Sequence, residues 1–270
     1  MYPEVFHLRF LHTYGVLVAL AFLAALWLAG RLAKPAGLNP EDVTNVGIYC
    51  ALASIGGAKL MMFLVDFRYY TEHPGEIFSL GTLQAGGVFY GGLIGALAVA
   101  AWYIRRRRLP VLQTADVFAP AIALGHGIGR LGCFSAGCCW GVECHLPWAV
   151  TFTDPVAKDL VGVPLGVPLH PTQLYEAFAE FAIFAVLYWR IQKPHQPGAV
   201  ISLYLLLYST VRFVVEFFRN HEQGNLLGGP LDTSQWISLA LFLLGAAYFI
   251  WGRRTASGTG DRFLSPVNRR

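Results

Sequence analysis

Long apolar segments alternate with short polar segments along most of this chain. Seven apolar segments are long enough to cross a membrane, which takes about 20 mostly apolar residues. They cover residues 13–32, 44–66, 84–104, 114–133, 172–190, 198–218 and 234–252. We therefore predict an all-α integral membrane protein with seven transmembrane helices.

The same pattern shows no boundary between domains. We predict a single seven-helix membrane domain over residues 1–254. The longest connection between predicted helices is 141–170, which contains four prolines. Residues 255–270 are rich in serine, threonine, glycine and arginine, which predicts a disordered tail.

The composition agrees with a membrane protein. Hydrophobic residues make up 55% of the chain and charged residues 13%, whereas a soluble domain has about 25% charged residues. The first apolar segment is not predicted to be a cleaved signal peptide. Its charges, Arg31 and Lys34, follow the apolar stretch, whereas a signal peptide carries its charge in front.

The basic residues predict the orientation. Thirteen of the 20 lysines and arginines follow the first, third, fifth and seventh apolar segments. Basic loops stay in the cytoplasm, so we predict an outside N-terminus, a cytoplasmic C-terminus and an exported 141–170 connection. The arginine run 105–108 is explained as an anchor against anionic lipid, and no nucleic-acid binding is predicted.

Polar and ionisable residues inside the predicted helices mark a candidate site. A charged side chain within a bilayer is costly and by default indicates function. Because a helix rises about 1.5 Å per residue, the predicted topology places these residues at one level near the outer leaflet. They are Tyr14, Lys59, Tyr90, Arg130, Tyr175, Glu176 and Arg212, with Glu216 and Arg219 just above.

Two interpretations of these charges stay open at this point. Arg212 could simply neutralise Glu216, and Arg130 could neutralise Glu176, as buried structural pairs. Alternatively, the excess of cationic side chains binds an anion, and an arginine pair suits the phosphate of a lipid headgroup. The excess of positive charge favours the second interpretation.

Glycines recur at small-xxx-small spacing in the third segment, at Gly87, Gly91 and Gly95. This spacing is typical of closely packed helices. The alternative is that bare backbone gives a ligand headgroup room to approach.

Four cysteines lie within twelve residues, at Cys133, Cys138, Cys139 and Cys144. Their spacing matches no familiar metal-ligand motif, so packing or a disulfide is favoured over contact with the substrate or a metal site. His126, one helical turn before Arg130, is either a hydrogen-bonded core residue or a proton acceptor.

Four segments resemble motifs of the prolipoprotein diacylglyceryl transferase family. They are Gly-Gly-Val-Phe-Tyr-Gly-Gly-Leu-Ile-Gly at 86–95, the Gly-Arg signature at 129–141, His-Pro-Thr-Gln-Leu-Tyr-Glu at 170–176 and Arg-Phe-Val-Val-Glu-Phe-Phe-Arg at 212–219. Tyr14 and Gly15 match a further Tyr-Gly pair, so the resemblance extends over nearly the whole chain.

The resemblance implies a bacterial inner-membrane enzyme without metal or soluble cofactor. Such an enzyme moves the diacylglyceryl group of phosphatidylglycerol onto the lipobox cysteine of a prolipoprotein. The implied catalytic residues are Arg130, Arg212, His126, Tyr90 and Glu216. The implied substrate contacts are Arg130, Arg219, Lys59, Tyr14, Gly91, Gly92, Cys133, Cys138, Tyr175 and Glu176.

The chain departs from the family pattern at three positions. Tyr90 stands where the family has a histidine, and Cys133 and Cys138 stand where its signature has asparagine and glutamate. A paralogue with an altered acceptor is therefore one alternative function. A transporter for an anionic solute and a metal or redox protein using the cysteines are two others. Polar residues gathered on one side of the membrane argue against a transport path.

Overall fold

The structure is a computed structural model that describes residues 13–79, 81–82, 86–220 and 229–256, with side chains up to residue 250. The chain forms two compact units. One unit contains Met1–Ala36 and Leu112–Arg270, and the other contains Gly37–Val111. The predicted single domain stays a prediction.

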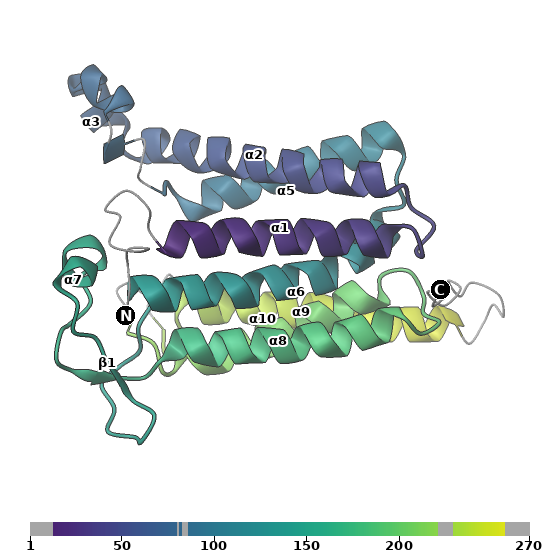
Figure 1. The fold of residues 1–270 in the computed structure, drawn as a ribbon. Helices are drawn as coiled ribbons and strands as arrows, with labels where there is room; N and C mark the ends of the chain where they lie inside the picture. Colours follow the sequence, from purple (N-terminus) through teal and green to yellow (C-terminus); the bar gives the residue numbers. More distant parts are fainter. Residues whose placement is uncertain (1–12, 80, 83–85, 221–228, 257–270) are drawn as a thin grey trace. The chain divides into compact units, whose positions relative to one another are not determined.

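Within the described residues, a helix of at least 18 residues covers most of each of the seven predicted segments (Figure 1). They are α1 (Thr13–Ala33), α2 (Pro40–Val65), α5 (Phe89–Arg107), α6 (Val111–Ala136), α8 (Thr172–Ile191), α9 (Ala199–Glu216) and α10 (Thr233–Ala256). Shorter helices, α3 (Phe67–Glu72) and η2 (Pro74–Phe78), follow α2.

Five of these helices are long and apolar enough to cross a membrane: α1, α2, α6, α9 and α10. The other two are more polar, because α5 ends in three arginines and α8 carries Glu176 and Glu180. The described chain is therefore that of a helical, multi-pass membrane protein.

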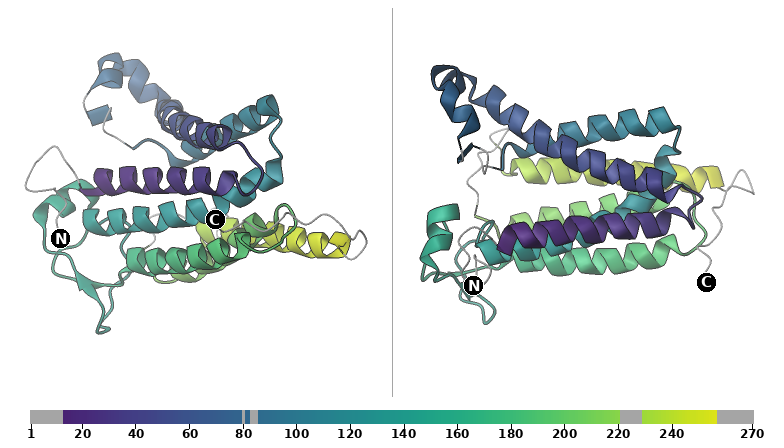
Figure 2. Two further views of the ribbon diagram at one scale, coloured as in Figure 1. Left: turned by 45° about the vertical axis from the view of Figure 1, so that its right-hand side comes forward. Right: turned by 45° about the horizontal axis from the view of Figure 1, so that its top comes forward.

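The helices of the larger unit lie side by side as a bundle (Figures 1 and 2), with α9 and α10 behind α6 and α8 in Figure 1. At Gly125 of α6, an added Cβ would lie 3.2 Å from the Cβ of Ala25 in α1. At Gly127, on the opposite side of α6, it would lie 2.8 Å from the ring of Phe181 in α8. Small residues thus let α6 lie closely between α1 and α8. Helix α9 packs between α8 and α10.

A buried carboxylate fixes the start of α9. Both oxygens of Asp116, in α6, accept backbone hydrogen bonds at 2.6–2.9 Å, from Gly198, Val200 and Ile201. The first N–H groups of a helix have no partner within the helix, and a carboxylate satisfies them well. Asp116 therefore sets the position of α9 relative to α6.

In the smaller unit, the small-residue pattern is a helix-packing surface. A Cβ at Gly91 of α5 would collide with the backbone of Gly57 in α2 and with the side chain of Met61. A Cβ at Gly92 would lie 2.8 Å from the hydroxyl of Ser54. Close packing alone accounts for glycine at both positions.

The 141–170 connection has more structure than the sequence predicted. A two-residue strand β1 (Val150–Thr151) pairs antiparallel with β2 (Pro168–Leu169), and the short helix α7 (Pro155–Val161) lies between them. Two-residue strands are too short to produce an alternating pattern. A small apolar core of Phe152, Ala157, Val163 and Leu169 holds the segment together. Of the predicted 255–270 tail, Thr255 and Ala256 continue α10, and 257–270 lie outside the described residues.

Candidate active site

One carboxylate joins two arginines from different helices. Glu176, in the second turn of α8, has its Oε2 2.6 Å from Nη2 of Arg130 in α6. Its Oε1 is 3.0 Å from Nη1 of Arg212 in α9. Glu176 is only 3% exposed, so both ion pairs lie in a place of low dielectric, where electrostatic interactions are strong.

Chain direction explains why these residues meet. Arg130 lies near the end of α6, Glu176 near the start of α8 and Arg212 near the end of α9. Because α8 runs opposite to α6 and α9, all three positions fall at the same end of the bundle (Figure 1).

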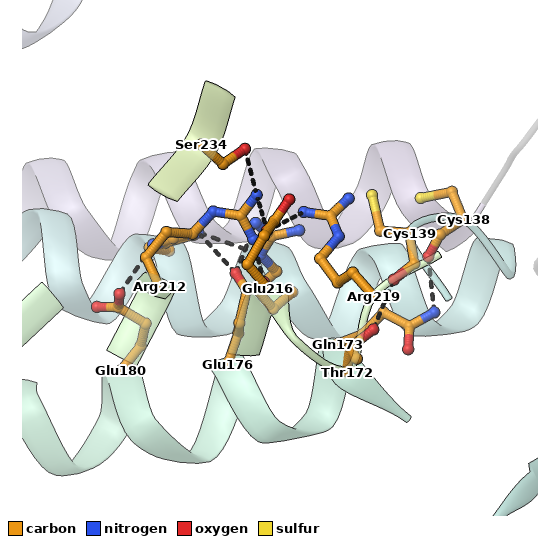
Figure 3. A network of polar contacts seen from close by, with 12 residues as sticks. Cys138, Cys139, Thr172, Gln173, Glu176, Glu180, Arg212, Glu216, Arg219 and Ser234 are labelled. Atoms are coloured by element: carbon orange, nitrogen blue, oxygen red, sulfur yellow. Dashed lines mark hydrogen bonds and ion pairs between the residues drawn. The ribbon is translucent and has the colours of Figure 1, made fainter. Parts of the chain in front are cut away.

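Three further groups extend the network around Arg212 (Figure 3). Its Nη2 lies 2.7 Å from Glu216 Oε2 and donates to the hydroxyl of Ser234 in α10, at 3.2 Å. Arg219 Nη1 lies 3.9 Å from the same Glu216 oxygen. Helix α9 ends at Glu216. Arg219 lies beyond that end, in an isolated β-bridge with Gly141.

His126 lies between an acid and Arg130. Its Nδ1 is 3.0 Å from Oε1 of the buried Glu180. Its Nε2 accepts a hydrogen bond from Nε of Arg130 at 3.2 Å. Since Nε2 accepts, the neutral ring carries its proton on Nδ1 and donates it to Glu180. Both ring nitrogens are therefore engaged, and the ring of Tyr208 lies against the imidazole, with ring centroids 5.6 Å apart.

The charges of this network balance when all six groups are ionised. Three arginines, Arg130, Arg212 and Arg219, face three glutamates, Glu176, Glu180 and Glu216. The excess of cations predicted from the sequence included Lys59 and left out Glu180, which is the third acid of this network. That residue was detectable as a second acid one turn after Glu176 in an apolar segment. The contacts above use Nε and Nη2 of Arg130. A guanidinium carries five N–H donors, which is more than these contacts use.

Three cysteine sulfurs gather beside the arginines. The Sγ atoms of Cys133, Cys138 and Cys139 all lie within 4.8 Å of one another. Hydrogen bonds from the Cys133 and Cys138 thiols, and then the charges of Arg130 and Arg219, hold the pKa of the Cys139 thiol below its ordinary value. All five cysteines of the chain lie in the described residues and are free thiols, so the structure contains none of the disulfides that the sequence allowed.

Two substrate-contact candidates lie at the edges of this site. Tyr14, at the start of α1, is 44% exposed, and its ring lies beside Gly132 of α6. The hydroxyl of Tyr175 accepts a hydrogen bond from Trp148 Nε1 at 2.8 Å and lies 3.0 Å from Nδ1 of His170. Tyr175 thereby ties the 141–170 segment to the start of α8.

The other four candidate residues, Lys59, Tyr90, Gly91 and Gly92, belong to the unit of residues 37–111. Lys59 donates a hydrogen bond to the backbone carbonyl of Thr82. Tyr90, the second residue of α5, is 47% exposed. Gly91 and Gly92 face α2, as described above. The roles predicted for these four residues stay predictions.

Sequence reasoning missed several residues that hold the site together. They are Glu180, Tyr208, Ser234, Thr172, Gln173 and His170. Most are neutral side chains in or next to apolar segments, where a single sequence gives no signal that separates them from ordinary helix residues. His170, Thr172 and Gln173 lay inside a segment that the family resemblance had already marked.

Comparison with known proteins gives the family of the chain. A family model described as prolipoprotein diacylglyceryl transferase matches residues 3–251. The phosphatidylglycerol–prolipoprotein diacylglyceryl transferase of Clostridium tetani is 36% identical over 247 residues, 91% of this chain and 94% of its own length. The enzyme of that name from Bordetella avium is 36% identical over 254 residues, 92% of each chain.

Proposed function

Because this chain belongs to the prolipoprotein diacylglyceryl transferase family, we propose that it is the enzyme that its relatives' names describe. It transfers the diacylglyceryl group of phosphatidylglycerol to a prolipoprotein. The acceptor is the thiol of the lipobox cysteine, in the signal peptide of the precursor. The observation that carries this proposal is the pair of arginines, Arg130 and Arg212, held by one buried carboxylate.

The proposed topology has seven spans, with the N-terminus outside and the C-terminus in the cytoplasm of a bacterial inner membrane. The distribution of basic residues supports this orientation. It places the end of α6, the start of α8 and the end of α9 near the outer leaflet. Phosphatidylglycerol of that leaflet would then reach the arginines without crossing the bilayer.

The reaction is a displacement at carbon. The thiolate sulfur of the acceptor forms a bond to the glyceryl carbon, and the bond from that carbon to the phosphate oxygen breaks. The electron pair of the broken bond leaves with glycerol phosphate. Negative charge therefore grows on the phosphate, where cationic donors fixed in advance stabilise the transition state most.

Arg130 and Arg212 suit this role because their positions are fixed before substrate binds. Glu176 holds both guanidinium groups, and Glu216 and Ser234 hold Arg212 a second time. N–H donors beyond these contacts can bind phosphate oxygens. Arg219, whose side chain is 19% exposed, guides the headgroup, with Tyr14 and Tyr175 as further proposed substrate contacts.

His126 is assigned here to positioning Arg130. Its Nε2 receives the Arg130 Nε–H, and its Nδ1–H is directed at Glu180. For His126 to accept the thiol proton, as the sequence predicted, its Nε2 would first have to leave Arg130. Tyr90 is the second predicted acceptor, and its role stays a prediction.

The test is transfer itself. Purified protein, phosphatidylglycerol vesicles and a lipobox peptide are combined, and the peptide is analysed by mass spectrometry for the mass of a diacylglyceryl group on its cysteine. A peptide with serine in place of that cysteine is the control. If the protein gave no transfer but moved phosphate across the vesicle membrane, the transporter alternative would replace this proposal.

A further inference from the structure

The three clustered thiols form a more specific arrangement than their spacing indicated. Cys133 is in the last turn of α6, and Cys138 and Cys139 follow the end of the helix. A C-x4-C-C spacing resembles no common ligand motif, yet the three Sγ atoms lie within 4.8 Å of one another.

The end of α6 produces this convergence. The Cys138 N–H donates to the Cys133 carbonyl at 3.1 Å, and the Gly137 N–H donates to the Phe134 carbonyl at 3.3 Å. Gly137 has φ +79°. These two bonds around a left-handed glycine form a Schellman cap, which folds the chain back over the last turn. The cap therefore brings Cys138 next to Cys133.

The following residue is held just as firmly. Cys139 has φ +60°, which is uncommon for a residue with a side chain. Its carbonyl accepts from the hydroxyl of Thr172 at 2.8 Å, and the Cys138 carbonyl accepts from Nε2 of Gln173 at 2.6 Å. Both donors are 1% exposed, at the start of α8. A turn anchored by two buried side chains keeps the three sulfurs together.

We propose that Cys133, Cys138 and Cys139 bind one Zn²⁺ ion, leaving its fourth coordination position for the thiol of the acceptor cysteine. Catalytic zinc sites commonly have three protein ligands and one open position. Tetrahedral Zn–S bonds of about 2.3 Å place sulfurs about 3.8 Å apart, so the thiols need to approach by at most about 1 Å.

Nearby charge suits such a centre. Three thiolates and one Zn²⁺ carry a net charge of −1. Arg130 and Arg219 lie close enough to act electrostatically on Cys139, and their positive charges favour thiolates there while they also pair with Glu176 and Glu216. Figure 3 shows the sulfurs of Cys138 and Cys139 beside the guanidinium of Arg219.

This inference rests on the proposed function and supplies a step that it lacks. Neither nitrogen of His126 is placed to take the acceptor proton, because Arg130 and Glu180 engage both. A thiol that coordinates Zn²⁺ loses its proton, here to water. Its sulfur then forms the bond to the glyceryl carbon, and the electron pair of the broken carbon–oxygen bond leaves with glycerol phosphate. The thioether product is a weak ligand and departs.

The experiment measures metal binding directly. Full-length protein is purified in detergent with reductant, and its zinc content is determined. It is then stripped with chelator and titrated with Zn²⁺ or Co²⁺ alone. We expect one equivalent of Zn²⁺ per chain, and the sulfur-to-cobalt charge-transfer absorption of thiolate ligands in the Co²⁺ form. Adding the lipobox peptide to the Co²⁺ form should change the cobalt spectrum, and the serine peptide should not.

Variants locate the site. Cys133→Ser, Cys138→Ser and Cys139→Ser should each weaken metal binding by more than roughly tenfold. Cys144→Ser, from the same part of the chain, is the matched control and should bind metal as the parent does. Thermal unfolding in detergent checks that each variant is folded, and Cys→Ala replaces any serine variant that is not.

The contrary outcomes are distinct. Reduced, folded protein that binds no Zn²⁺, or variants that bind it as tightly as the parent, would overturn the metal site. If the cobalt spectrum did not change when the lipobox peptide was added, the peptide thiol would not occupy the fourth coordination position. Full transferase activity in metal-free protein refutes the inference and leaves the proposed function intact. Metal bound at these cysteines without any transfer from phosphatidylglycerol refutes the proposed function instead.

Discussion

The Nε–H of Arg130 donates a hydrogen bond to Nε2 of His126, 3.2 Å away. A histidine that receives this bond has its available lone pair occupied. The relationship therefore favours His126 as a residue that positions Arg130 over one that removes a proton from substrate.

Substitution of His126 separates these two roles. Glutamine keeps one acceptor and one donor but does not titrate, so His126→Gln should retain most of the rate with an unchanged pH–rate profile. His126→Ala loses both contacts and should lower kcat more than tenfold, while Tyr90→Phe should lie nearer the parent. A pH–rate profile that loses its limb near neutrality in His126→Gln would restore the proton-acceptor role.

Loss of either phosphate-binding arginine should be severe. Arg130→Ala and Arg212→Ala should each lower kcat by about 100- to 1,000-fold, as expected when one donor is removed from an anion-stabilising site. Arg212→Lys should also be impaired, because lysine cannot reproduce the forked contacts to Glu176 and Glu216. The exposed Arg68, changed to alanine, is the matched control. Parent-like kcat in either alanine variant, at equal protein levels, would disprove this role.

Glu176 should matter for stability as well as rate. Glu176→Gln leaves two buried guanidinium groups without their shared counter-charge, and loss of one partner of a buried ion pair costs about 3–5 kcal/mol. We expect a large fall in Tm, measured in detergent, together with loss of transfer. Glu143→Gln, at an exposed carboxylate, should change neither. An unchanged Tm would show that the arginines find other partners.

Asp116 should affect stability alone. Asp116→Asn places an amide N–H among the backbone N–H groups that begin α9, and a buried donor left unsatisfied costs about 1–3 kcal/mol. We expect a lower Tm with kcat unchanged at temperatures where the variant is folded. Asp159→Asn, on the surface of α7, is the control. If kcat fell in a fully folded Asp116→Asn variant, the position of α9 would matter for catalysis as well.

The long apolar segments predicted the helices well because most of these segments end at strong polar signals. Asn39 and Pro40, for example, start α2 with a side-chain cap, and Arg105–Arg107 end α5. Two helix ends differ from the prediction: α5 begins at Phe89, with the described residues 86–88 outside the helix, and α9 ends early. The apolar pattern of α9 continued to residue 218, yet the chain leaves the helix after Glu216, and a backbone bridge to Gly141 then places Arg219. That bridge comes from a distant segment, so local sequence gives no sign of it.

The sequence predicted the part of the site in which the position of a residue along its helix decides which residues it meets. Arg130, Glu176 and Arg212 were placed at one level by counting residues, with Glu216 just above, and the structure joins them. Side-chain geometry was not predictable in the same way. The convergence of Cys133 with Cys138 depends on a helix cap, and the engagement of His126 depends on Glu180, a contact 54 positions away in the chain.

The bond between Arg130 and Glu176 also constrains how the chain is made. The two residues are 46 positions apart, so at a synthesis rate of roughly 5–20 residues per second the arginine emerges about 2–9 s before its partner. An unpaired arginine in a membrane helix costs up to about 2.5–3.5 kcal/mol on insertion scales, the value for the helix centre, and α8 brings two glutamates of its own. Each helix alone would carry unpaired charge into the lipid, whereas Arg130 and Glu176 neutralise each other when α6 and α8 are together. The α6 and α8 segments should therefore wait beside the translocation machinery and enter the bilayer as a pair.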